Sequence, residues 1–191
     1  GGYKPGLYGA QASVSASSSP DYYSYTAGGT LTGDFRDKLI TVTAGYAFSY
    51  DTIGRGPNNW LKDFLKDKGY IYTHEIQAGV TFIISPTSIA LIGGTFAMER
   101  GDGSQPYRYI PMFEAENVAP FVPVGATVDL VNRVRLPVKP LEQLPTERDR
   151  IAVGARFNKR LQNATFRIEQ RFYVDTWGMK ASSTDTRYMV D

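Results

Sequence analysis

The chain has 191 residues, a net charge of +2 and no cysteine. Its length fits one domain or part of a larger one, and the lack of cysteine excludes disulfides, thiolate metal sites, attached c-type haem and cysteine nucleophiles. The near-neutral charge and the dispersed basic residues disfavour nucleic-acid binding.

Eight segments alternate large apolar residues with small or polar ones at a period of two, which predicts β-strands. In chain order they span residues 7–16, 22–35, 38–50, 70–84, 88–99, 150–160, 163–177 and 184–191. In 38–50 the large apolar residues occupy most even positions from Ile40 to Tyr50, with threonine, glycine, alanine and serine between them. Between Phe166 and Asp175, four charged residues and Tyr173 form the polar side, and Gln170 is the one polar residue on the apolar side.

The connections between these strands alternate in length. "FRDK", "SPTS" and "NKRLQN" are short, whereas "SSSPD", residues 51–69, residues 100–149 and "GMKASSTD" are longer. Short turns at one end and longer loops at the other are typical of membrane β-barrels, whose strands need about 9–11 residues. We therefore predict an all-β fold, an antiparallel transmembrane β-barrel with about eight strands in this chain. A soluble β-rich binding domain is the alternative.

Two connecting segments have features of their own. Residues 58–68, "NNWLKDFLKDK", place apolar residues at helical spacing and predict a short loop helix. Residues 100–149 hold seven of the 11 prolines, yet they are too apolar for a disordered polar tail. We expect this long loop to lie outside the cell or to plug the barrel, with an extra hairpin around "TVDLVNRVRL" as one arrangement.

Several runs resemble a family of outer-membrane barrels, domain of unknown function 3570, found in myxobacteria and related Gram-negative bacteria. The runs are "PDYYSY" (20–25), "SYDTIGR" (49–55), "ERGDGSQPYRYIPMF" (99–113), "RLPVKPLEQLPTERDR" (135–150) and "DTWGMKASSTDTRYMVD" (175–191). Members of that family are longer than this chain and have further strands on both sides. The resemblance implies that residues 1–191 form a single barrel domain or a fragment of a larger barrel, and it supplies no activity or catalytic residues.

If apolar side chains face lipid, the opposite side chains line the barrel interior, because hydrocarbon cannot satisfy a charge. The expected lining residues are Glu75, Arg156, Arg167, Glu169, Arg171 and Asp175. In the long loop, the candidates for contact with a partner are Tyr107, Tyr109, Phe113, Phe121, Arg133 and Arg135. The single histidine, His74, falls on the apolar side, and we interpret it as a residue of the membrane rim.

The sequence has no P-loop, dinucleotide fingerprint, HExxH motif or EF-hand loop, and no nucleophile elbow. We therefore expect no enzyme activity, no cofactor and no metal. The function we predict is a passive pore for small solutes in the outer membrane of a Gram-negative bacterium, in contact with lipid and lipopolysaccharide. The alternative is a barrel scaffold that docks or houses another envelope protein or lipoprotein through its long loop.

Overall fold

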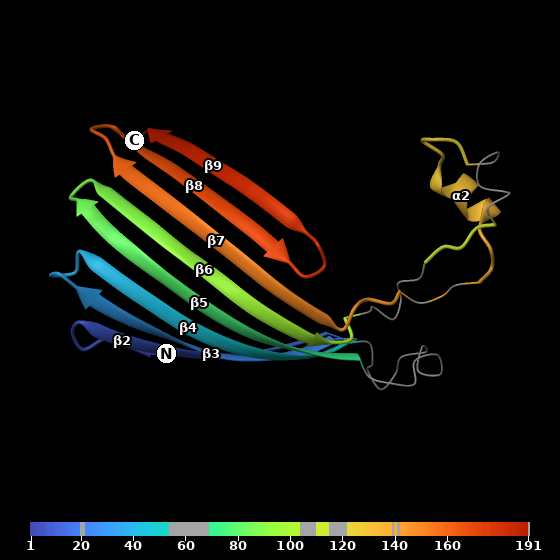
Figure 1. Cartoon of the computed structure of the whole chain (residues 1–191), viewed down its shortest axis with the longest axis horizontal. Helices are drawn as coiled ribbons and strands as arrows, with labels where there is room; N and C mark the ends of the chain where they lie inside the picture. Colours follow the sequence, from blue (N-terminus) through green and yellow to red (C-terminus); the bar gives the residue numbers. More distant parts are fainter. Residues whose placement is uncertain are drawn as a thin grey trace.

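The computed structural model describes residues 1–19, 22–53, 69–103, 110–114, 122–138, 140 and 142–190. Over these residues nine strands form one antiparallel sheet, in which each strand pairs with its neighbours in sequence (Figure 1). The strands are β1 (Gly2–Tyr3), β2 (Tyr8–Ser19), β3 (Tyr22–Phe35), β4 (Ile40–Ile53), β5 (Gly69–Ser85), β6 (Ser88–Gly101), β7 (Glu147–Arg160), β8 (Ala164–Asp175) and β9 (Lys180–Val190). One helix, α2 (Val128–Val134), lies beyond the ends of the strands.

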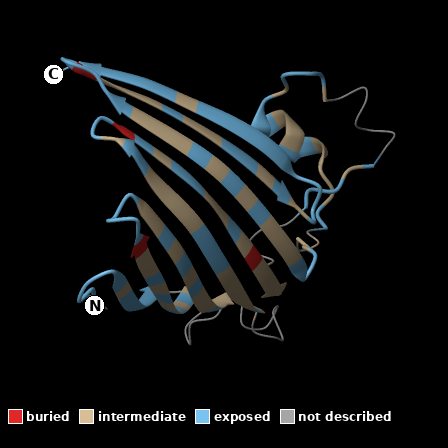
Figure 2. Ribbon diagram, turned by 60° about the vertical axis from the view of Figure 1, so that its left-hand side comes forward, coloured by how far each residue is buried: buried red, intermediate tan, exposed pale blue. Residues whose placement is uncertain are grey.

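The sheet is a single curved layer (Figure 2). Its two faces differ in chemistry and exposure. On β3, Tyr25 and Leu31 point to one face and are 59% and 65% exposed, whereas Ser24, Thr26 and Thr30 point to the other face and are half-buried. Side chains converge on the concave side of a curved sheet, so the less exposed polar face is the concave one. We call it the inner face, and the apolar convex side the outer face.

The described residues do not enclose a dry core. Their buried apolar residues are only Ala97 and Ala164, and no large side chain among them is fully buried. Val14 is 84% exposed and Phe172 is 57% exposed, both on the outer face. A soluble sheet stabilises itself by packing its apolar face against a second layer, and the described residues provide no such layer.

All eight predicted strands are present, and β1 is an additional two-residue strand. Two of the expected long connections are short, because β2 continues to Ser19 and β9 already begins at Lys180. Serine and threonine in these stretches pair in the sheet, as Ser19 does with Tyr22. The two long segments, 54–68 and 102–146, still attach at the same end of the sheet, which we call the loop end. The opposite end is the turn end.

The expectation of a hairpin around residues 127–136 is wrong, because this stretch contains the helix α2. The Oγ1 atom of Thr127 accepts a hydrogen bond from the Leu130 amide at 3.4 Å and so caps the first turn. Asp129 in the first turn and Arg133 in the last complement the helix dipole. The helix predicted at 58–68 lies outside the described residues. No described helix has the length and apolar character needed to cross a bilayer.

Candidate functional site

The pairing of β4–β8 places one row of residues across the inner face. Thr43 pairs with Gly79, Gly79 with Gly93, Gly93 with Gly154, and Gly154 with Arg171. Three neighbouring strands therefore have no side chain at this level. A hollow of about 400 Å³ lies over them, and we call it the glycine hollow. Its polar lining residues include Thr43, Gln77, Thr81, Thr95, Arg156 and Arg171.

A cluster of two arginines and one glutamate adjoins the hollow on its turn-end side. The Nε atom of Arg156 donates to Glu169 Oε2 at 2.7 Å, and Arg167 donates to the same oxygen at 2.5 Å. The register of β7 and β8 forms this cluster, because Arg156 and Glu169 are direct partners. Two guanidinium groups share one carboxylate, so the cluster keeps a formal charge of +1.

Arg171 differs from its neighbours because its guanidinium is unpaired. It lies on the inner face opposite Gly154, and it has no ion pair or side-chain hydrogen bond with any described residue. Arg187 on β9, by contrast, donates two hydrogen bonds to Asp185 at 2.8 and 2.9 Å. Arg171 therefore presents its N–H donors to the space over the inner face.

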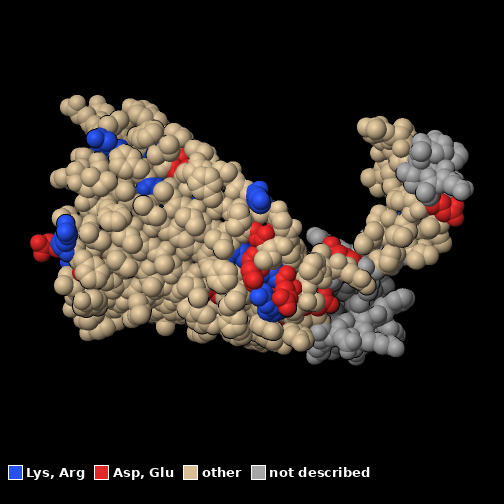
Figure 3. All heavy atoms as spheres, in the orientation of Figure 1, with Lys and Arg blue, Asp and Glu red and all other residues tan. Residues whose placement is uncertain are grey.

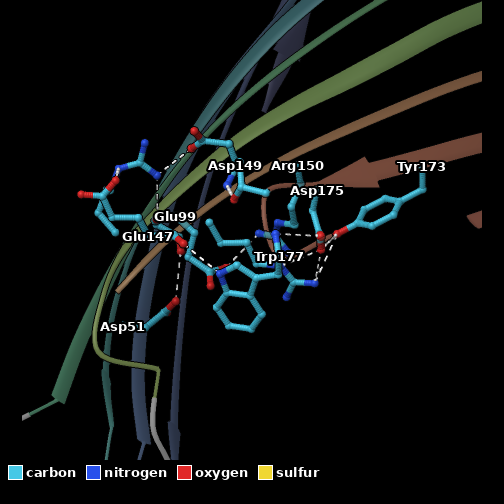
Figure 4. Close-up of polar contacts among 12 residues, drawn as sticks. Asp51, Glu99, Glu147, Asp149, Arg150, Tyr173, Asp175 and Trp177 are labelled. Atoms are coloured by element: carbon cyan, nitrogen blue, oxygen red, sulfur yellow. Dashed lines mark hydrogen bonds and ion pairs between the residues drawn. The ribbon is translucent and has the colours of Figure 1, made fainter. Parts of the chain in front are cut away.

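A second group of charges, which we call the rim cluster, lies at the loop end (Figure 4). Arg148 donates to Asp175 Oδ2 at 3.0 and 2.6 Å, and the hydroxyl of Tyr173 donates to the same oxygen at 2.9 Å. The Trp177 ring lies 4.4 Å from the Arg148 guanidinium carbon, and its Nε1 donates to the Glu147 carbonyl at 2.8 Å. These bonds hold the start of β7, where segment 102–146 rejoins the sheet.

Two further ion pairs extend the rim cluster to β6. Arg150 lies 3.0 Å from Glu99 on the inner face, and Arg100 lies 2.6 Å from Asp149 on the outer face. In Figure 3 charged groups gather at the two ends of the strands, and the middle of the visible face holds few. The band between the two ends therefore carries few charged groups on this face.

Charge on the inner face of β7–β9 is uneven along the strands. Between the hollow and the turn at Arg160, four arginines accompany two carboxylates, which leaves a formal charge of +2 among the described residues; these residues are Arg156, Arg167, Arg171, Arg187, Glu169 and Asp185. Towards the loop end, Arg148 and Arg150 are both paired with carboxylates. The glycine hollow lies between the two regions, and Arg171 and Arg156 reach it from the cationic side.

The sequence pattern that defines the family of proteins of unknown function DUF3570 matches residues 8–191. The chain belongs to this family. Comparison of the DUF3570 chain with curated proteins and with solved structures returned no match. The family description assigns no activity.

In this DUF3570 chain, all six expected lining residues lie on the inner face. Arg156, Arg167 and Glu169 form one cluster, while Asp175 belongs to the rim cluster. Arg171 lines the glycine hollow. Glu75 lies apart from these groups, between Ala47 and Ala97 in the register.

The expected contact residues of the long loop are only partly described. Phe113 and Arg135 are half-buried, and Arg133 is exposed on α2. Tyr107, Tyr109 and Phe121 lie outside the described residues. Backbone hydrogen bonds from Leu136 to Met112 and from Ile110 to Pro140 join two stretches of this segment side by side.

Sequence reasoning missed two features of the DUF3570 chain. The predicted strand starts at residue 150, whereas β7 starts at Glu147 and includes Arg148. Residues 147–150 are all charged, so they show no apolar–polar alternation that would mark the start of a strand. The glycine hollow has no local sequence pattern, because Gly79, Gly93 and Gly154 lie on three different strands and become neighbours only when the strands pair.

His74 lies on the outer face within a group of aromatic rings. Its Nδ1 is 2.6 Å from the Tyr46 hydroxyl, and the rings of Phe48 and Tyr72 lie 5.0 and 6.1 Å from its own. Aromatic and histidine rings with a polar tip suit the boundary between hydrocarbon and water. Among the described residues no group of three or more His, Asp and Glu could hold a metal ion.

Proposed function

We propose that this chain forms wall strands of a transmembrane β-barrel in the outer membrane of a Gram-negative bacterium. We further propose that the barrel is a passive pore for small solutes. The observation that carries this proposal is the inverted polarity of the sheet. On β3, β4, β7 and β8 the large apolar residues lie on the outer face and are mostly exposed, and the hydroxyl and charged residues lie on the less exposed inner face. β6, with Ile89 and Leu91 on the inner face, and β9, with Ser182 and Thr184 on the outer face, depart from this pattern.

Energetics favour lipid over water on the outer face. Exposing a large apolar side chain to water forfeits about 1.5–3 kcal/mol of burial free energy. Leu31, Ile76 and Phe172 all remain at least half exposed there. In hydrocarbon these side chains need no protein partner, whereas an arginine at the midplane costs about 2–4 kcal/mol. Arg156, Arg167 and Arg171 all avoid that cost by lying on the inner face.

Strand length supports the same proposal. β3, β4, β6 and β7 have 14 residues each, and β5 has 17. Crossing a bilayer takes about 9–11 tilted residues, whereas strands of soluble proteins are mostly about five or six residues long. The additional residues place the rim cluster beyond the hydrocarbon.

Extraction of native envelopes tests the location. A barrel stays in the membrane fraction after high-salt and alkaline washes and leaves it in detergent, whereas a soluble binding domain is released by salt. Planar lipid bilayers then test the pore. We expect the purified full-length protein to give stepwise conductance, and folded barrels that insert without conductance would refute the pore.

A scaffold is the second candidate, and one observation favours it. The described part of segment 102–146 carries exposed apolar residues around α2, among them Val124, Val128 and Met112. The prediction is that a second envelope protein copurifies with the chain and is released when residues 122–138 are deleted. If deletion leaves copurification unchanged, docking does not use this segment.

A further inference from the structure

We propose that the glycine hollow is a binding site for a small oxyanion, a carboxylate or phosphate group, and that Arg171 and Arg156 are its donors. The shape of the hollow is the first argument. Gly79, Gly93 and Gly154 leave a floor of bare backbone on three adjacent strands, and the volume of about 400 Å³ falls within the range of about 300–1,000 Å³ typical of small-molecule sites.

Charge is the second argument. The Arg171 guanidinium is unpaired among the described residues, and Arg156 bonds Glu169 through Nε. The terminal nitrogens of Arg156 have no hydrogen-bond partner in the described part of the chain. Because Glu169 is already shared with Arg167, it cannot also neutralise Arg171. The planar fork of N–H donors on arginine matches the oxygens of a carboxylate or phosphate.

The other walls of the hollow provide groups that suit such a ligand. Gln77, Thr43 and Thr95 face Arg171 and Arg156 across the glycine floor. Amide and hydroxyl groups hydrogen-bond to an oxyanion without adding charge. One carboxylate, Glu169, also lines the hollow, and its Oε2 atom is bonded to Arg156 and Arg167. Glu75 lies farther away, four residues from Gly79 along β5 towards the loop end.

Binding of the oxyanion has a consequence for transport, and this consequence rests on the proposed pore. An anion site beside a surface of formal charge +2 raises the local concentration of anions. Rings of arginine or lysine give anion selectivity to pores. We therefore infer that the interior prefers small oxyanions to cations, with Arg171 as the residue that sets the preference.

Binding is tested without transport, by titrating inorganic phosphate into the detergent-purified full-length protein in a calorimeter. Loss of one charge-assisted donor weakens such an interaction about tenfold or more, so Arg171→Gln should raise the dissociation constant for phosphate by about that factor. Lys180→Gln is the matched control, because it removes one positive charge from the outer face of β9, and it should leave binding unchanged. No heat of binding in the wild type, or equal binding by Arg171→Gln, would overturn the site.

Gly79→Val gives a second and independent variant. A Cβ atom at Gly79 meets no atom closer than 3.5 Å, so the added side chain starts from an uncrowded position and covers part of the glycine floor, and valine is favoured in strands. Phosphate binding should be lost although both arginines remain. Retained binding in a folded Gly79→Val protein would show that the ligand lies elsewhere.

Bilayer recordings separate this inference from the proposed function. In a KCl gradient, the reversal potential of the wild type should show a preference for chloride, and phosphate should reduce the current. Arg171→Gln should weaken both effects. Phosphate binding without conductance refutes the pore and leaves the site, whereas conductance without anion preference or phosphate block refutes the selectivity and leaves the pore.

Discussion

Replacing Val153 by arginine tests which face of the sheet meets lipid. Val153 lies at the middle of β7 on the outer face, where it pairs with Gly94 and Phe172 and is 49% exposed. Its neighbour Ala152 points to the inner face between Thr95 and Tyr173. The two positions are adjacent on the same strand, so each is the control for the other.

The expected effect follows from the medium on each side. At the bilayer midplane, Val153→Arg should lower the free energy of unfolding by about 2–4 kcal/mol, or about 30- to 700-fold in the folding equilibrium. Ala152→Arg places the same charge in a polar interior and should change the free energy far less. In a soluble protein, Val153→Arg at a half-exposed site would change it by only about 0.5 kcal/mol.

The assay is a urea titration of each full-length variant in lipid vesicles, in which intrinsic fluorescence reports the fraction of unfolded protein. We expect a large decrease in the free energy of unfolding for Val153→Arg and a small decrease for Ala152→Arg. Equal shifts, or a harmless Val153→Arg, would refute the assignment of the outer face to lipid. A larger decrease in the free energy of unfolding for Ala152→Arg would indicate that the inner face meets lipid and the outer face does not.

Three further predictions concern single contacts. Gln170 donates to Ser182 at 2.8 Å and accepts from Thr184 on the outer face, so Gln170→Ala should lower the free energy of unfolding by about 1 kcal/mol in urea titration. Adding Ser182→Ala and Thr184→Val removes the abandoned hydroxyls and should restore most of that loss; a triple variant no more stable than the single one would contradict this account. A Cβ atom at Gly101, where φ is +125°, would lie 2.0 Å from the Tyr70 carbonyl oxygen, so Gly101→Ala should sharply lower the unfolding midpoint, whereas Gly125→Ala, where φ is +84° and no atom lies within 4 Å, should cost only about 1–2 kcal/mol. Trp177→Phe keeps a ring over Arg148 but loses the 2.8 Å bond to the Glu147 carbonyl, so hydrogen exchange at the start of β7 should accelerate while exchange at the β7–β8 turn stays unchanged.

Much of the sheet was predictable because alternation is a local property. In 38–50 and 163–177, large apolar residues alternate with small or polar ones, so the type of each side chain indicates the face of the sheet on which it lies. The limits of β2 and β9 were harder, because serine and threonine favour turns and also pair in strands. The stretch around α2 has only a short apolar run, which suits a hairpin or a helix equally, and the capping bond of Thr127 favours the helix.

The site itself was only half predictable. Phase along a strand assigns Arg156, Arg167 and Glu169 to one face, and the structure brings them into contact. The alternation along one strand does not reveal which residues of neighbouring strands pair with one another in the sheet. The glycine hollow needs Gly79, Gly93 and Gly154 at one level, and the long segment 102–146 separates the last from the others in sequence. Such a site depends on the pairing register of the strands, so no short sequence motif reveals it.

The same charges also explain why the register holds. A slip of one residue between neighbouring strands reverses the face of every side chain on the slipped strand. If β8 slipped against β7, Arg167, Glu169 and Arg171 would turn to the outer face, and Arg156 would lose its partner Glu169. If the outer face meets lipid as proposed, each misplaced arginine costs about 2–4 kcal/mol. The inner-face charges therefore stabilise the alignment that creates the glycine hollow, even where an individual ion pair contributes little.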